Sequence, residues 1–116
     1  MNRIDFAPGQ GRPVDRFSSH GATSVALGSG EGEAHVYALD FAPGGAIGRH
    51  RAGFDQLFLV VAGSGWAEGD DGERVSLGTG QGVRFARGEM HAKGSDAGMR
   101  AIMIQVAALG PAAEET

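Results

Sequence analysis

Two histidines carry the clearest chemistry in this sequence, because each follows a glycine-rich turn and lies beside an apolar segment. His50 belongs to the stretch 44–63, GGAIGRHRAGFDQLFLVVAG, and His91 ends the stretch 80–91, GQGVRFARGEMH. Imidazole binds divalent transition metals and exchanges a proton near neutral pH. We therefore expect His50 and His91 to converge in one cavity and to form a metal centre or a ligand pocket.

The segments that must position these histidines have the pattern of short strands. The 116 residues include 21 glycines and 4 prolines, and the glycines separate apolar runs. No long amphipathic helix pattern and no internal repeat is present. The sequence predicts an all-β fold, an antiparallel β-barrel or jelly roll, with about seven to nine short strands.

Individual strands are predicted from alternation with a period of two and from continuous apolar runs. Alternation over 35–41 places His35 and Tyr37 on one face. The run QLFLVVA at 56–62 is typical of a strand covered on both sides, and Gly63 and Gly65 predict a turn from it into a strand that begins at Trp66. The other predicted strands are 14–17, 22–27, 75–77, 83–85 and 100–106.

Composition excludes several kinds of partner and site. The net charge of −4 argues against nucleic acid or an anionic membrane as the partner. Without cysteine the chain has no disulfide and no thiolate metal site. The N-terminus lacks an apolar signal core, and no apolar run approaches the about 20 residues that cross a bilayer. We expect a cytoplasmic protein whose partner is a small molecule.

The first histidine stretch resembles the first motif of the cupin superfamily. That motif is a glycine, five residues, His-x-His, then a glutamate and a closing glycine. Gly44, His50 and Gly63 match it in register, whereas Ala52 replaces the second histidine and Gln56 replaces the glutamate.

The second stretch resembles the second cupin motif, in which a glycine precedes Pro-x-Gly, a histidine and an asparagine. Gly80, Gly88 and His91 match, whereas Ala86 and Ser95 depart from the motif. The resemblance covers roughly residues 20–108 and implies a cupin-like barrel.

In metal-binding cupins, as the resemblance implies, histidines and the glutamate hold a divalent metal inside the barrel. The candidate metal ligands here are His50, Gln56 and His91, and the metal would be Fe, Zn, Ni, Mn or Cu. His35 is the candidate replacement for the missing imidazole. Because Gln56 is uncharged, the site loses the electrostatic attraction that a carboxylate would give the metal. For unit charges about 4 Å apart at an effective dielectric of about 20, this attraction is on the order of 4 kcal/mol. A metal-free or weakly loaded pocket is therefore the alternative.

Further candidates for a ligand pocket are the side chains that alternate toward the expected barrel interior. They are His35, Tyr37, Phe58, Trp66, Phe85 and Gln105. The aromatic members are equally compatible with an ordinary hydrophobic core, and Gln56 with a buried amide that bridges backbone groups.

Two functions stay open. One is a divalent-metal-dependent enzyme of dioxygenase, isomerase or lyase type, and the other is a non-catalytic, metal-free module that binds a ligand or regulates. No catalytic residue can be named, and the sequence leaves open whether the protein is an enzyme. Basic residues flank both histidines, either as outward-pointing charges or as a rim that steers an anionic ligand. They are Arg49, Arg51, Arg87 and Lys93.

The chain divides into three expected regions: an N-terminal arm at 1–20, the barrel domain at 21–108 and a frayed tail at 109–116. By resemblance, cupins commonly dimerise through sheet edges and N-terminal arms. We therefore also expect a homodimer.

Overall fold

The structure, a computed structural model, describes residues 1–112. Apart from one 3-10 turn, η1 (Pro8–Gln10), every element within that range is a β-strand, and every pairing is antiparallel. The strands are β1 (Asn2–Asp5), β2 (Arg12–Pro13), β3 (Thr23–Ser24), β4 (Ser29–Phe41), β5 (Ala46–Arg51), β6 (Asp55–Glu68), β7 (Arg74–Gly78), β8 (Gln81–Phe85), β9 (Met90–Gly94) and β10 (Met99–Gly110). The all-β antiparallel fold that the sequence predicts is confirmed.

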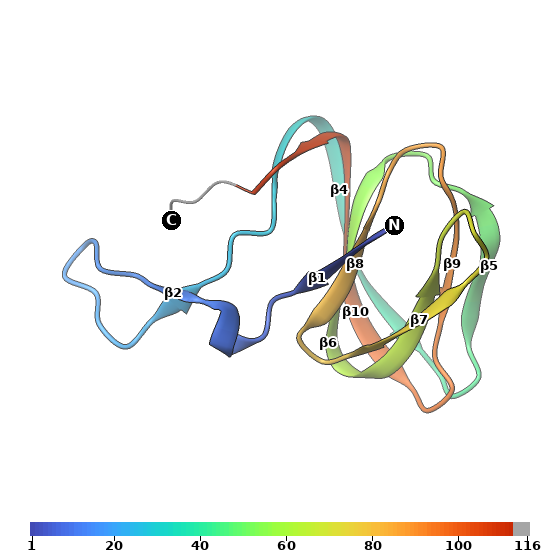
Figure 1. Ribbon diagram of the computed structural model, residues 1–116, viewed down its shortest axis with the longest axis horizontal. Coiled ribbons are helices and arrows are strands. Elements are labelled where there is room, and N and C mark those ends of the chain that lie inside the picture. Colours follow the sequence, from blue (N-terminus) through green and yellow to red (C-terminus); the bar gives the residue numbers. More distant parts are fainter. Residues whose placement is uncertain (113–116) are drawn as a thin grey trace.

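Eight strands form one sheet that bends into two layers, and β6 is the strand that both layers share (Figure 1). The first part of β6 pairs with β8 and β10, and β1 and β4 lie at the outer edges of this layer in the order β1-β8-β6-β10-β4. The last part of β6, residues 64–68, pairs with β7 and with β9, which in turn pairs with β5. The second layer therefore carries both histidine stretches.

Gly63 lies where β6 passes from one layer to the other. Its φ of +77° is in the region that favours glycine, and a Cβ there would lie 2.4 Å from the Gly98 carbonyl oxygen. The facing strand shifts register between Arg100 and Ala101, which lets the pairing continue through the bend. The predicted turn at 63–65 is therefore wrong, because the chain bends here without leaving the strand.

Two apolar clusters lie on opposite faces of the first layer. The inner cluster, between the layers, consists of Phe41, Phe58, Val60, Ala67, Leu77, Val83, Phe85, Met99 and Ala101. The outer cluster consists of Leu57, Leu59, Val106 and Leu109, with Ile4, Phe6, Leu27 and Ile104 packed against it. Residues 57–60 of β6 alternate between the two clusters, so the prediction that this run is covered on both sides is confirmed for 56–60. It is wrong for 61–62, because Val61 is 41% exposed and Ala62 is exposed as well.

The other strand predictions had mixed outcomes. The segments 35–41, 75–77, 83–85 and 100–106 lie in β4, β7, β8 and β10 and are confirmed. The strand predicted at 14–17 is wrong, and only two residues of 22–27 are in a strand, because the short β2–β3 pair forms there instead. Sequence patterns also missed β5 and β9, the strands that carry the two histidines.

The predicted arm and tail contain residues of the main sheet. β1 pairs with β8, and the segment from η1 to β3 projects to one side of the barrel (Figure 1). In the predicted tail, Leu109 and Gly110 belong to β10, and residues 113–116 lie outside the described part of the chain. The division into arm, barrel and tail stays a prediction. No helix among the described residues is long and apolar enough to cross a membrane.

Candidate functional site

The structure brings His50 and His91 together. They are directly opposite each other in the β5–β9 pair, and their ring centroids are 4.5 Å apart at an interplanar angle of 52°. His50 is exposed, with Nδ1 2.8 Å from the Gly48 carbonyl oxygen. His91 is only 1% exposed. The pair therefore runs from the surface into the barrel.

His91 is a buried imidazole with unmet hydrogen-bonding capacity. Its ring lies edge-on to Phe85 at 4.7 Å, and neither ring nitrogen has a hydrogen-bond partner among residues 1–112. The pKa of His91 is lowered to about 4, mainly by burial, and the nearby charges of Lys93 and His50 contribute to the same shift. At neutral pH the ring is uncharged, so one nitrogen can donate a hydrogen bond and the other can accept one.

Lys93 is the second ionisable side chain in the barrel interior, and it is also only 1% exposed. Its Nζ donates a hydrogen bond to Gln56 Oε1 and lies 3.5 Å from Met103 Sδ. The same nitrogen is 4.8 Å from the centroid of the Phe58 ring and 5.3 Å from that of Phe85. Burial lowers the pKa of Lys93 to about 8. At pH 7 most molecules therefore hold an ammonium ion beside Gln56.

Sequence reasoning missed this role of Lys93, which it placed with the charges that flank the histidines. The structure corrects that interpretation, because Lys93 points into the barrel rather than outward or to a rim. Two signals were available. Lys93 lies two residues after His91 and so shares its face of β9, and it is the sole lysine among 10 basic residues.

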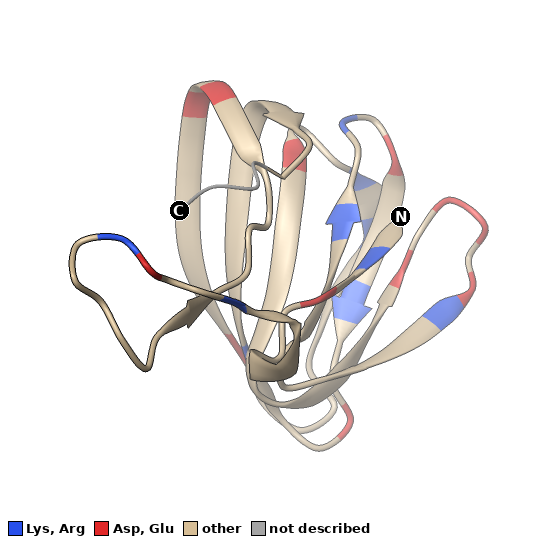
Figure 2. Cartoon of the chain, turned by 60° about the vertical axis from the view of Figure 1, so that its left-hand side comes forward, with Lys and Arg blue, Asp and Glu red and all other residues tan. Residues whose placement is uncertain are grey.

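The flanking arginines instead contact neighbouring turns. Arg49 donates hydrogen bonds of 2.9 Å to the carbonyl oxygens of Gly69 and Asp70, and Arg51 donates one of 3.0 Å to Gly88. Charged residues of both signs are spread over several strands and loops (Figure 2). These contacts give the two arginines a structural role in fixing β5.

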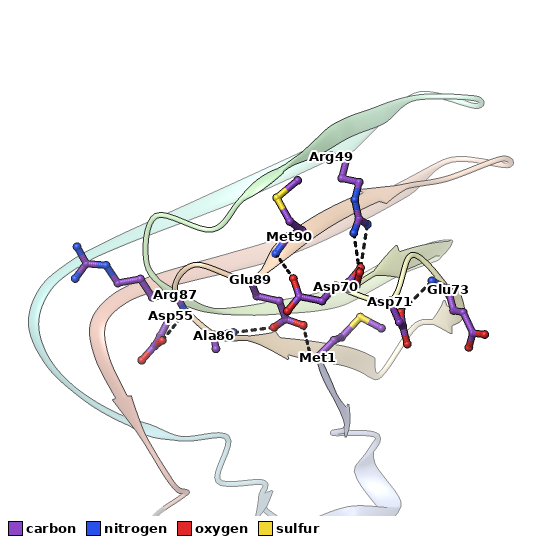
Figure 3. Close-up of polar contacts among 11 residues, drawn as sticks. Met1, Arg49, Asp55, Asp70, Asp71, Glu73, Ala86, Arg87, Glu89 and Met90 are labelled. Carbon is purple, nitrogen blue, oxygen red and sulfur yellow. Dashed lines mark hydrogen bonds and ion pairs between the residues drawn. The ribbon is translucent and has the colours of Figure 1, made fainter.

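Acidic residues hold the loop that leads into His91 (Figure 3). The Glu89 carboxylate accepts a hydrogen bond from the backbone N–H of Ala86 at 3.1 Å. It also forms an ion pair with the terminal amine of Met1 at 2.5 Å. Asp70, on the hairpin between β6 and β7, accepts the backbone N–H of Met90 at 2.7 Å. Because Met90 directly precedes His91, these contacts fix the position of the buried imidazole.

Facing Lys93, three polar side chains form a row across the other layer. His35 of β4 is paired with Gln105 of β10, which is paired with Gln56 of β6. Gln56 is buried, Gln105 is half-buried and the His35 side chain is 41% exposed. The row therefore leads from Lys93 toward solvent.

His35 does not join the other two histidines. Its Nε2 lies 2.5 Å from Glu33 Oε2, and its ring packs against Phe54 at 5.5 Å and Tyr37 at 6.4 Å. Within residues 1–112, no three side chains of His, Asp or Glu lie close enough together to hold a metal ion. The hypothesis that His35 supplies the missing imidazole has no support in this geometry.

The remaining pocket candidates differ in position. Phe58 and Phe85 are fully buried and flank Lys93, whereas Tyr37 is 45% exposed. Trp66 is half-buried and packs over Gly94. The guanidinium carbon of Arg74 lies over the Trp66 ring, 3.6 Å from the ring centroid. Phe58 and Phe85 therefore line the site, and the described contacts of Trp66 are elsewhere.

A separate hollow of about 290 Å³ lies between the outer ends of β4 and β10. Residues 29–31 and 108–110 line it, and Glu31 is the charged residue among them. It contains no histidine and lies apart from the two motifs.

No protein-family model matches the sequence, and no curated protein is significantly similar to it. Solved structures are similar. A cupin-like protein from Thermotoga maritima has a TM-score of 0.61 and 25% identity over 69% of this chain and 62% of that chain. An RmlC-like cupin from Shewanella frigidimarina has a TM-score of 0.61 and 21% identity over 66% and 68%. A predicted oxalate decarboxylase from Thermotoga maritima has a TM-score of 0.58 and 17% identity over 63% and 65%. The chain spans less than two thirds of the length of the first and third of these.

Proposed function

Since this chain has the fold of the cupin superfamily, we propose that it binds a small anionic molecule inside its barrel without a divalent metal. The observation that carries this proposal is the hydrogen bond from the Lys93 ammonium to Gln56 Oε1, beside the unpartnered ring of His91. The protein itself thus supplies a cation at the site.

The side chains around His91 do not fit a divalent metal. Ala52 offers no donor where the motif has its second histidine, and the oxygen of Gln56 already accepts from an ammonium ion. Two unit charges about 4 Å apart repel by about 4 kcal/mol at an effective dielectric of about 20, and the metal carries two charges. No carboxylate joins His50 and His91 in the described residues to offset this repulsion.

The same side chains fit a small anion. An ammonium ion has three N–H donors, and among residues 1–112 Lys93 contacts one oxygen acceptor, Gln56, and one sulfur. A carboxylate or similar group could accept the remaining Lys93 donors and a hydrogen bond from His91. A buried ionisable side chain with a strongly lowered pKa is typical of functional sites.

The second candidate is a metal-dependent enzyme, which the contact between His50 and His91 favours. One similar structure from Thermotoga maritima is described as a predicted oxalate decarboxylase, which is the name of an enzyme. The Lys93 ammonium argues against this candidate.

Metal analysis tests the metal-free part of the proposal. Protein purified without a histidine tag should contain well under one equivalent of transition metal, and calorimetric titration with Co(II) should show no tight binding. Gln56→Glu alone would pair the new carboxylate with Lys93. Only the double variant Gln56→Glu with Lys93→Ala should gain Co(II) binding. Stoichiometric metal in the wild-type protein that is lost in His91→Ala would overturn the metal-free assignment.

Thermal unfolding with acetate, glycolate and inorganic phosphate tests anion binding. A ligand at about 100 times its Kd stabilises a protein by about 2.7 kcal/mol. We expect at least one of these anions to raise the Tm of the wild type and none to raise that of Lys93→Met, which keeps a long buried side chain without charge. Equal shifts in both proteins would contradict the proposal.

A further inference from the structure

We propose that Lys93 is a nucleophilic amine that forms an imine with a small aldehyde or ketone, whose anionic group the same site binds. This inference rests on the proposed function, because the ligand must first enter the barrel. It adds a covalent step at one named atom, Lys93 Nζ.

The placement of the lysine is the first argument. Nine of the ten basic residues are arginines, and the one lysine is among the most buried side chains of the molecule. Arginine remains protonated and carries no nucleophilic lone pair at physiological pH, whereas a lysine amine in an apolar site can attack carbonyl carbon. This chain therefore has lysine at a position where its amine differs chemically from arginine.

The surroundings of Nζ are the second argument. The Phe58 and Phe85 rings and the Met103 sulfur lie around the nitrogen, and Gln56 Oε1 orients it. These apolar contacts disfavour the ammonium form and so favour the neutral amine, which is the nucleophile. Exclusion of water from this interior would also slow hydrolysis of an imine.

His91 supplies the third argument. Its neutral ring lies on the same face of β9, also contacts Phe85 and has both nitrogens free of partners within residues 1–112. During the reaction Nζ bonds to the carbonyl carbon, and the carbonyl oxygen leaves as water with the two protons that the nitrogen loses. A neutral imidazole can accept a proton from the attacking amine and return it to the leaving oxygen. No oxidant or reductant is needed for this step.

The polar row marks the direction from which a ligand would approach Lys93. Gln56, Gln105 and His35 lie side by side across β6, β10 and β4, and Gln56 is buried whereas Gln105 and His35 are partly exposed. Their side chains can hydrogen-bond to a polar ligand that moves toward Lys93.

Reductive trapping tests the inference. The folded protein is incubated with glyoxylate and sodium cyanoborohydride, digested and analysed by mass spectrometry. Cyanoborohydride reduces an imine to a stable amine, so Lys93 should carry a carboxymethyl group. The reference is the same chain unfolded in urea, in which Lys93 is accessible but has no organised site. We expect the labelling rate of the folded protein to exceed that of the unfolded reference by at least about tenfold. This threshold is set below the rate factor of about 10²–10⁴ that general acid–base catalysis supplies. A rate in the folded protein equal to or slower than the reference overturns the inference.

Two comparisons separate this inference from the proposed function. Glycolate has the carboxylate of glyoxylate but no carbonyl group, and it should raise the Tm and slow the labelling by competition. If glycolate stabilises the protein and Lys93 is not labelled, the imine is wrong and anion binding stands. If Lys93 is labelled rapidly and no anion stabilises the protein, Lys93 is a reactive amine that forms imines, whereas the proposed function and the anionic group assigned to the ligand are wrong. His91→Gln, which keeps a polar side chain of similar size, should slow labelling and flatten its pH profile, whereas a His91 that only packs would leave the profile unchanged.

Discussion

The barrel interior holds two ionisable side chains, His91 and Lys93, and burial favours the neutral form of both. The two side chains differ in charge and in hydrogen bonding. His91 is neutral at physiological pH with its nitrogens unpartnered in the described residues, whereas Lys93 remains largely charged and uses Gln56 as its oxygen acceptor. One side chain therefore offers a proton acceptor and the other offers a cation within the same interior.

The lowered pKa of His91 predicts a stability loss in acid. The unfolded chain takes up this proton near pH 6.5, but the folded chain does so only near pH 4. Stability that is present above pH 6.5 is therefore lost as the pH falls toward 4, by about 3 kcal/mol from this residue at about 1.36 kcal/mol per pKa unit. Urea unfolding of wild type and His91→Gln at pH 7 and pH 4.5 measures it. The wild type should lose more stability than the variant, and parallel losses would show that His91 does not titrate as described.

At the scale of elements, Asp55 fixes the start of β6 and so positions the next residue, Gln56. Asp55 Oδ1 accepts the backbone N–H of Arg87 at 2.9 Å, and Oδ2 accepts that of Leu109 at 3.0 Å. These backbone hydrogen bonds hold the pKa of Asp55 below its usual value. One carboxylate thus ties β6 to the end of β10 and to the loop after β8.

We expect Asp55→Asn to lower the free energy of unfolding by about 1–3 kcal/mol, because an amide has one acceptor oxygen and cannot satisfy both backbone groups. Asp40→Asn is the matched control, since Asp40 is exposed and lies 3.7 Å from Arg100 in a surface ion pair. That substitution should change stability by about 0–1 kcal/mol. Urea unfolding at pH 7 compares them, and similar losses in both variants would contradict the role assigned to Asp55.

On the scale of the whole molecule, the first sheet layer is covered on both faces by different parts of the chain. The second layer covers the inner face, and residues from the N-terminal part of the chain cover part of the outer face, where Ile4, Phe6 and Leu27 pack against the outer cluster. Removal of the N-terminal segment would therefore strip β1 from the sheet and uncover an apolar surface.

Phe6→Ala should lower the free energy of unfolding by about 1–3 kcal/mol, because a partly buried aromatic ring is removed from the outer cluster. Phe17→Ala is the matched control in the same segment, since Phe17 is 85% exposed, and it should stay within about 0.5 kcal/mol of the wild type. Thermal or urea unfolding distinguishes them. Equal effects would show that Phe6 contributes no more than a surface residue.

The expected homodimer stays a prediction. Removal of the predicted N-terminal arm would not test it, because that deletion also removes β1 and destabilises the monomer. The mass of the intact chain in solution, measured by light scattering over a range of concentrations, tests it directly.

The sequence by itself determined the fold class and the approach of the two histidines. Continuous and alternating apolar patterns located β4, β6, β7, β8 and β10, because those strands have strong local periodicity. The spacing of glycine and histidine in two separate stretches predicted that His50 and His91 meet. The assigned metal-ligand and pocket roles stay predictions.

Only the tertiary structure decided which side chains are enclosed with His91. β9 has the sequence MHAKG, which lacks the apolar alternation of a recognisable strand, so the inward direction of Lys93 was not evident. The burial of Lys93 comes from Phe58 and Gln56 on β6 and Met103 on β10, which are distant in the chain. A local pattern records the period of one segment, whereas burial depends on which other segments fold over it. For that reason the charge at the centre of the site became visible only in the folded molecule.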